Sequence, residues 1–215
     1  SFCSELYPGW LTHWGEQWQK PDTTNLLRDV KYLLEQKKSF SFYVLHGGTN
    51  FGFNAGANAF SATQYLPDVT SYDYNAPIDE QGNPTYKYFA LRKLIGSYVN
   101  YSLPDIPAPV RAIEIAPFNL VPFTSVFNNL PTPIVTVQPQ PMENFNQYEG
   151  FILYRTKLIG PHGGKLLITE PHDYVLVFLN GVFVDTIYRD GGRWSIDIPE
   201  ATCENAVLEI LVEGM

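Results

Sequence analysis

A carboxylate beside several aromatic side chains stands at the start of the printed sequence. Glu5 is followed closely by Tyr7, Trp10 and Trp14. An anion near the anomeric carbon stabilises an oxocarbenium-like transition state, and the C–H faces of pyranose rings stack on Trp and Tyr. The segment therefore indicates sugar chemistry, with a surface glutamate beside aromatic core residues as the alternative interpretation.

Two further segments are rich in residues that suit a ligand site. Residues 39–45, SFSFYVL, form a short apolar run typical of a buried strand and lead into residues 46–58, HGGTNFGFNAGAN. Residues 70–77 read TSYDYNAP. Long loops in compact domains are usually functional, and Gly, Asn and Tyr allow tight turns and hydrogen bonds to hydroxyl groups. A packed loop whose Asn side chains cap their own backbone is the alternative.

In this order and spacing, the three segments resemble the catalytic domain of the glycoside hydrolase family 35 β-galactosidases. The resemblance is motif-specific over residues 1–99 and looser from Tyr148 onward. It implies a retaining β-galactosidase that hydrolyses terminal non-reducing β-D-galactosides, in an oligosaccharide or glycoconjugate, through a covalent galactosyl-enzyme intermediate. It also implies a lysosomal, secreted or periplasmic location.

The resemblance assigns roles to five residues. Glu5 matches the family's nucleophile, and Tyr7 and Trp10 match aromatic residues that line the pocket. Tyr43 matches a tyrosine near the nucleophile and the sugar, and Tyr74 matches one that hydrogen-bonds galactose. For each tyrosine, the alternative is a packing residue at the end of a barrel, with its hydroxyl bonded to backbone.

The second carboxyl group of a retaining glycosidase has no match in this chain. Retaining hydrolysis needs an acid/base carboxyl roughly 5 to 5.5 Å from the nucleophile. In the family, that group lies in an Asn-Glu-Tyr-type segment on the fourth barrel strand. Glu143 and Glu204 also neighbour an asparagine, but both fall in the β-rich part and we assign neither. A non-catalytic carbohydrate-binding or structural fragment is therefore the alternative function.

We expect an α/β plus all-β fold, with the C-terminal portion of a (β/α)8 TIM barrel followed by a β-sandwich or jelly-roll domain. A complete barrel takes roughly 250 residues, so residues 1–100 would supply only its last two strands and helices, and the chain would be a fragment. The expected elements are strands at residues 1–5 and 39–45, a helix over the Leu26–Leu34 pattern with Asp22, Thr23 or Thr24 as N-cap, and a helix at residues 86–98.

The second expected domain, residues 101–215, begins with a proline-rich linker and continues with strand-like segments. Asn180-Gly181 between two apolar runs predicts a β-hairpin with a type I′ turn. The predicted strands lie at residues 174–179, 182–188, 194–198 and 206–212, and Asp190-Gly191-Gly192 predicts a further turn. This sandwich domain could be incomplete.

The composition of the chain argues against some classes of binding partner. The formal net charge is −8, with 22 acidic and 14 basic residues, which argues against nucleic acid and anionic membranes. No apolar run has the 18 or so residues that a membrane-spanning helix needs. Aromatic residues make up 15% of the chain, which suits a carbohydrate binder and also β-domain packing. The motifs specify no oligomeric state.

Cysteine and histidine positions indicate neither a disulfide nor a metal site. Cys3 and Cys203 fall in different expected domains, so we expect no disulfide and read Cys3 as a small hydrophobic residue of the barrel wall. No pair among the histidines has metal-ligand spacing, and no glycine-rich nucleotide motif is present. We therefore predict no cofactor. The histidines are His13, His46, His162 and His172.

Overall fold

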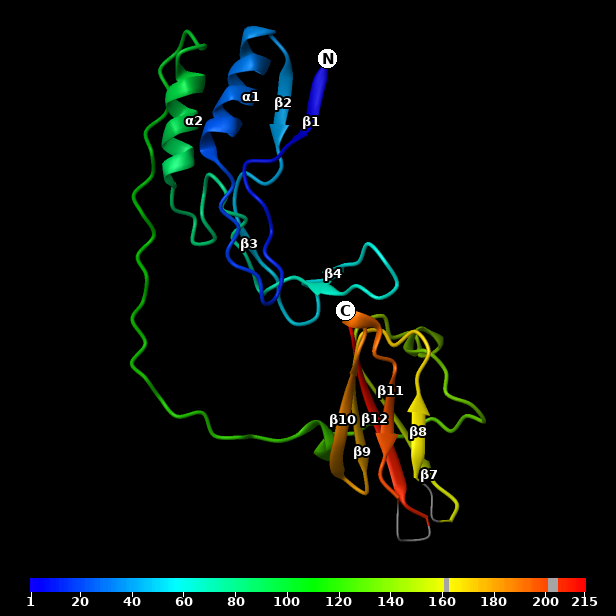
Figure 1. Cartoon of the computed structure of the whole chain (residues 1–215). Helices are drawn as coiled ribbons and strands as arrows, with labels where there is room; N and C mark the ends of the chain where they lie inside the picture. Colours follow the sequence, from blue (N-terminus) through cyan, green and yellow to red (C-terminus); the bar gives the residue numbers. More distant parts are fainter. Residues whose placement is uncertain (161–162, 201–204) are drawn as a thin grey trace. The chain divides into compact units, whose positions relative to one another are not determined.

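The computed structural model of this chain describes residues 1–160, 163–200 and 205–215 (Figure 1). The chain divides into two units by the density of its contacts. Ser1–Val110 and Glu149–Met215 form the first, and Arg111–Tyr148 forms the second. The second unit holds two short 3-10 helices, η1 (Val126–Asn128) and η2 (Met142–Phe145), in otherwise irregular chain.

The N-terminal part of the first unit is built on a pair of parallel strands. β1 (Phe2–Leu6) pairs with β2 (Ser39–Phe42), and α1 (Thr23–Glu35) connects them. The side chain of Asp22 accepts a hydrogen bond from the backbone N–H of Thr24 at 2.8 Å, which identifies Asp22 as the N-cap among the three candidates. The predicted β-α-β order is therefore confirmed at the level of these elements.

A second helix, α2 (Tyr86–Gly96), lies beside α1 (Figure 1). Leu26 and Val30 of α1 and Leu91 of α2 form a buried core, against which residues of both strands pack. These positions follow the helical period of the sequence. The predicted helix at residues 86–98 is confirmed, although it ends two residues earlier, where the Ser97 hydroxyl donates to the Leu94 carbonyl at 2.7 Å.

The predicted strand at residues 39–45 is wrong in its last three residues. β2 ends at Phe42 because its partner β1 ends at Leu6, and Pro8 has no N–H with which to continue the ladder. Tyr43 therefore follows the strand, and its backbone N–H still donates to the Leu6 carbonyl at 2.9 Å. Tyr43 therefore lies at the carboxyl edge of the β1–β2 pair and not within β2.

The long segment between β2 and α2 is held by two short antiparallel pairs. β3 (Gly48–Thr49) pairs with β6 (Ser71–Tyr72), and β4 (Ala57–Asn58) pairs with β5 (Leu66–Pro67). These pairs satisfy backbone groups of a segment that lacks any sequence periodicity. They also bring residues 70–77 back beside residues 46–49.

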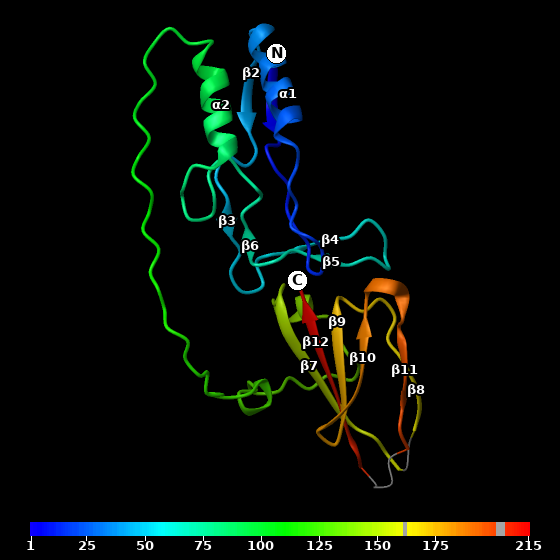
Figure 2. The same ribbon diagram turned by 60° about the vertical axis from the view of Figure 1, so that its left-hand side comes forward.

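The C-terminal part of the first unit contains two antiparallel sheets (Figure 2). The larger sheet has the order β10-β9-β12-β7 and the smaller one pairs β11 with β8. Their bounds are Gly150–Lys157 for β7, Gly164–Leu167 for β8, Tyr174–Leu179 for β9, Val182–Tyr188 for β10, Ser195–Ile198 for β11 and Val207–Gly214 for β12. The four predicted strands are confirmed as β9, β10, β11 and β12, with shifts at some ends.

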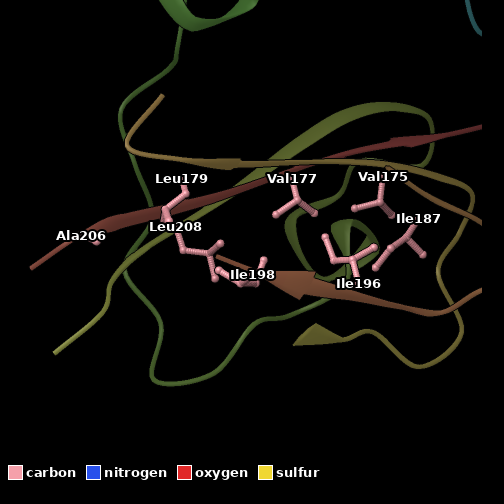
Figure 3. Packing of buried hydrophobic residues seen from close by; sticks show 8 residues of the cluster. All are labelled: Val175, Val177, Leu179, Ile187, Ile196, Ile198, Ala206 and Leu208. Atoms are coloured by element: carbon pink, nitrogen blue, oxygen red, sulfur yellow. The ribbon is translucent and has the colours of Figure 1, made fainter. Parts of the chain in front are cut away.

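Both sheets contribute to one apolar core. Alternate residues of β9, Val175 and Val177 among them, are fully buried, as expected for side chains that point to one face of a strand. Figure 3 shows them facing Ile196 and Ile198 of β11. The two sheets of this part therefore pack on a single apolar core.

The β9–β10 hairpin has the predicted turn. Asn180 and Gly181 have φ values of 51° and 74°, and a type I′ turn requires positive φ at both central residues. The turn after β10 forms as the short 3-10 helix η3 (Asp190–Gly192).

Cys3 is a half-buried free thiol whose Sγ donates to the Glu5 carbonyl at 3.6 Å. Cys203 and His162 lie outside the described residues, as does Glu204. Within the described ranges, no helix combines the length and the apolar character needed to cross a membrane.

Candidate active site

The five residues that the sequence singles out lie at one edge of the β1–β2 pair. Glu5 is near the end of β1, Tyr7 and Trp10 follow that strand, and Tyr43 follows β2. Tyr74 comes from the segment after β6. Parallel strands end at the same edge of a sheet, and ligands of α/β folds bind outside these carboxyl ends. The topology therefore gathers residues that are up to 69 positions apart in the numbering.

Four rings, those of Tyr7, Trp10, Tyr43 and Tyr74, form what we call the aromatic cluster. The Tyr7 ring centroid lies 5.8 Å from that of Trp10 and 5.6 Å from that of Tyr43. The Tyr74 centroid lies 6.2 Å from Trp10 and 6.1 Å from Tyr43. Most of these pairs meet edge to face, the arrangement that the ring quadrupoles favour. Tyr74 is buried, whereas the other three rings are nearly half exposed.

Glu5 is joined to the aromatic cluster by a hydrogen bond from the Tyr7 hydroxyl to the Glu5 Oε2 atom. This bond, followed by burial and the negative charge of the carboxylate, raises the pKa of the Tyr7 hydroxyl. Tyr7 therefore stays a neutral donor at physiological pH. The Glu5 side chain is exposed, so the carboxylate is oriented by one partner and accessible to a ligand.

Backbone contacts fix the two segments that carry Trp10 and Tyr74. The Trp10 N–H donates to the Tyr74 carbonyl at 3.0 Å. Gly9 lies so close to this carbonyl that a Cβ atom on it would be 1.6 Å from the Tyr74 oxygen. A residue without a side chain is therefore required at position 9 for this approach.

Tyr72 is a member of the site region to which the sequence assigned no role. Its ring centroid lies 5.3 Å from that of Tyr74. Burial, followed by a hydrogen bond with the Tyr43 side chain, raises the pKa of the Tyr72 hydroxyl. Its place in the TSYDYNAP segment, two residues before Tyr74, was the signal that could have identified it.

His13 forms a second polar network that the sequence did not indicate. Its Nε2 atom lies 2.9 Å from the Asn58 Oδ1 atom and 3.6 Å from the Asp68 Oδ1 atom, and its Nδ1 atom lies 3.1 Å from the Glu16 Oε1 atom. Burial alone would lower the pKa of His13, but the bonds to Asn58 and Glu16 and the two carboxylates raise it. The network joins the segment after β1 to residues 57–68.

Other carboxylates near the site are engaged with the protein itself. Glu80 accepts hydrogen bonds from the Thr49 and Ser71 hydroxyls. Asp73 accepts from the backbone N–H groups of Asn75 at 3.2 Å and Glu80 at 3.1 Å. These hydrogen bonds connect β3, β6 and the segment that follows β6. Across the described part of the chain, no three His, Cys, Asp or Glu residues are grouped as metal ligands would be.

Comparison with known proteins agrees with the character of this site. Residues 1–98 match the model of glycosyl hydrolases family 35, and residues 139–215 match the model of the first all-β domain of β-galactosidases. An exposed carboxylate among aromatic rings, at the carboxyl edge of parallel strands, is the kind of site that a glycosidase uses. Both matches support membership of glycosyl hydrolase family 35.

Curated proteins similar to this chain are named as β-galactosidases or β-galactosidase-like proteins. A β-galactosidase of Xanthomonas manihotis is 36% identical over 212 residues, which cover 98% of this chain and 35% of that protein. β-Galactosidase 17 of Arabidopsis thaliana is 37% identical, over 99% of this chain and 33% of its own length. The human β-galactosidase-1-like protein 2 is 33% identical, over 98% of this chain and 33% of its own length. The chain spans about a third of the length of these curated relatives.

Proposed function

We propose that the intact polypeptide containing these residues is a retaining β-galactosidase that hydrolyses terminal non-reducing β-D-galactosides. The observation that carries the proposal is the position of Glu5, exposed at the carboxyl edge of β1 and bonded to a tyrosine of the aromatic cluster. Family membership and the names of the relatives support the same activity.

In this proposal Glu5 is the nucleophile. One carboxylate oxygen attacks the anomeric carbon as the glycosidic bond breaks, forming a galactosyl ester, and water then releases galactose with β-configuration. The hydrogen bond from Tyr7 holds the Oε2 atom and leaves the other oxygen free to attack. The acid/base carboxyl is not assigned to a residue of this chain, because no segment here matches the Asn-Glu-Tyr-type pattern that carries it in the family.

The aromatic cluster provides the sugar contacts. The half-exposed ring of Trp10 offers an apolar face to the C–H groups of galactose. Tyr43 lies close to both Tyr7 and Tyr74 and contacts the sugar near the nucleophile. Tyr74, whose pKa is raised by burial and by neighbouring tyrosines, stays protonated and donates a hydrogen bond to a galactose hydroxyl.

The fold assignment is part of the same proposal. We infer that residues 1–100 are the C-terminal portion of a (β/α)8 barrel and that residues 101–215 are a linker and a jelly-roll-type sandwich. The parallel β1–β2 pair with α1 between its strands supports the first assignment. The two sheets that share one core support the second.

A mechanism-based label tests the proposal. A 2-deoxy-2-fluoro galactoside with a good leaving group lets a glycosyl ester accumulate, because fluorine destabilises the positive charge of the transition state. Digestion and mass spectrometry of the intact polypeptide should find the label on the peptide containing Glu5. Label on another carboxylate, such as Glu16 in the neighbouring segment, or hydrolysis with inversion, would contradict the assignment. Galactoside binding without hydrolysis or label would favour a non-catalytic carbohydrate-binding protein.

Trp10→Ala is expected to lower kcat/KM about 5- to 150-fold while the fold persists, because the sugar loses an aromatic contact of about 1 to 3 kcal/mol. Steady-state kinetics with an aryl β-galactoside measure this. Trp14→Ala is the matched control, because Trp14 is 78% exposed and lies outside the aromatic cluster. Equal kinetics in the two folded variants would place Trp10 in ordinary packing.

A further inference from the structure

Lys87 is a fully buried lysine beneath the candidate site. It lies in the first turn of α2 and has no exposed surface. Its Nζ atom donates to the Pro8 carbonyl at 2.7 Å and to the Asn75 carbonyl at 2.8 Å. Pro8 stands between Tyr7 and Trp10, and Asn75 follows Tyr74 directly. One side chain thus joins the two segments that carry three of the four rings of the aromatic cluster.

The helix gives no reason for a lysine at this position. A cation in the first turn of a helix is opposed by the helix dipole, which favours negative charge there. Lysine is almost never fully buried without a partner, and the two partners found here are backbone carbonyls of distant segments. The place of Lys87 is therefore explained by what it binds.

Burial also makes the charge of Lys87 costly. Desolvation lowers the pKa of Lys87 from 10.5 to about 8, and the Asp73 carboxylate only partly opposes this shift. Because the folded pKa is the lower one, the folded state loses the proton first as pH rises through about 8. The contribution of Lys87 to the free energy of unfolding therefore increases between about pH 8 and 10.5. Below about pH 8 the lysine is protonated in both the folded and the unfolded state, and the cost of burying its charge is constant.

We propose that Lys87 is a positioning residue for galactoside binding, one that fixes the Trp10 and Tyr74 segments relative to each other through the Pro8 and Asn75 carbonyls. Gly9 allows these segments their close approach, and the Trp10–Tyr74 backbone bond and the Lys87 ammonium then hold it from two sides. The sugar contact rests on the function proposed above, whereas the ordering of the two segments does not.

The test compares Lys87→Met with Leu91→Ala in the intact polypeptide. Methionine keeps the length of the side chain and removes both hydrogen bonds. Leu91 is the matched control, because it is buried one turn later on α2 and belongs to the apolar core with Leu26 and Val30 of α1, not to the aromatic cluster. Lys87→Met should lower kcat/KM about 10- to 100-fold, with a raised KM, since a displacement of about 1 Å at a site costs that much. Leu91→Ala should lower the melting temperature and leave KM unchanged.

A second readout does not depend on activity. With 5-fluorotryptophan incorporated, the ¹⁹F resonance of Trp10, assigned by its absence in Trp10→Phe, should shift or broaden in Lys87→Met and not in Leu91→Ala. A wild-type protein that fails to hydrolyse galactosides would refute the proposed function, and the Trp10 resonance would still test the positioning. Lys87→Gln, which keeps two N–H donors on a shorter side chain, should fall between wild type and Lys87→Met.

Two results would overturn the inference. The first is a folded Lys87→Met variant with unchanged KM and an unchanged Trp10 resonance. The second is the failure of both Lys87→Met and Lys87→Gln to fold while Leu91→Ala folds, since Lys87 would then be a requirement of the whole fold and not of the two segments.

Discussion

Glu5→Gln in the intact polypeptide is expected to lower kcat for an aryl β-galactoside by on the order of 10⁴- to 10⁶-fold, the loss seen when a catalytic nucleophile is removed. Glutamine keeps the shape of the side chain, and its amide oxygen can still accept the hydrogen bond from Tyr7. It lacks the negative charge and the nucleophilic oxygen, so the covalent step fails. Galactose binding, measured by calorimetry, should persist because the aromatic cluster is unchanged.

The same substitution at Glu35 provides the control. Glu35 lies on the exposed face of α1, where its carboxylate pairs with Lys31. Exposed ion pairs contribute little to stability, so Glu35→Gln should keep wild-type kinetics and melting temperature. Activity of Glu5→Gln close to that of Glu35→Gln would show that another carboxylate is the nucleophile.

Gly9→Ala is expected to damage the site strongly, although it adds only one methyl group. The new Cβ would lie 1.6 Å from the Tyr74 carbonyl oxygen and 2.8 Å from the Tyr74 carbonyl carbon, and backbone atoms cannot rotate away as a side chain can. The segments of Trp10 and Tyr74 must separate, which breaks the backbone bond between them. We expect kcat/KM to fall by about 10²-fold or more, with a lower melting temperature.

Gly48→Ala is the matched substitution for this prediction. Gly48 lies in β3, and a Cβ on it would meet no atom within 4 Å. Its kinetics and thermal unfolding should therefore match those of wild type. If Gly9→Ala retained full activity in the same assays, the close approach of the two segments would not matter for the site.

Local sequence patterns were sufficient for the elements whose stability is local. The apolar period of α1 and the short polar side chain of Asp22 at its start specify that helix and its cap. Asn180-Gly181 specifies a turn that few other dipeptides can form, and β9 and β10 follow from it. In each case the determining contacts lie within a few residues of one another.

The C-terminal end of β2 and the order of the strands within the two C-terminal sheets could not be predicted from local patterns. Residues 39–45 are mostly apolar and rich in aromatic residues, yet the strand stops at Phe42 because the partner strand stops. Similarly, β8 lies beside β11 only because the chain returns across the core, a pairing that no local pattern encodes.

The sequence by itself pointed to the side chains proposed to perform the chemistry. Glu5 and the rings of Tyr7, Trp10, Tyr43 and Tyr74 were assigned because their segments resemble those of the family. The tertiary structure alone decided how they are held. Lys87 meets Pro8 across 79 positions and His13 meets Asn58 across 45. A lysine or histidine is an ordinary surface residue until distant segments close over it, so its burial, its partners and the direction of its pKa shift exist only in the folded chain.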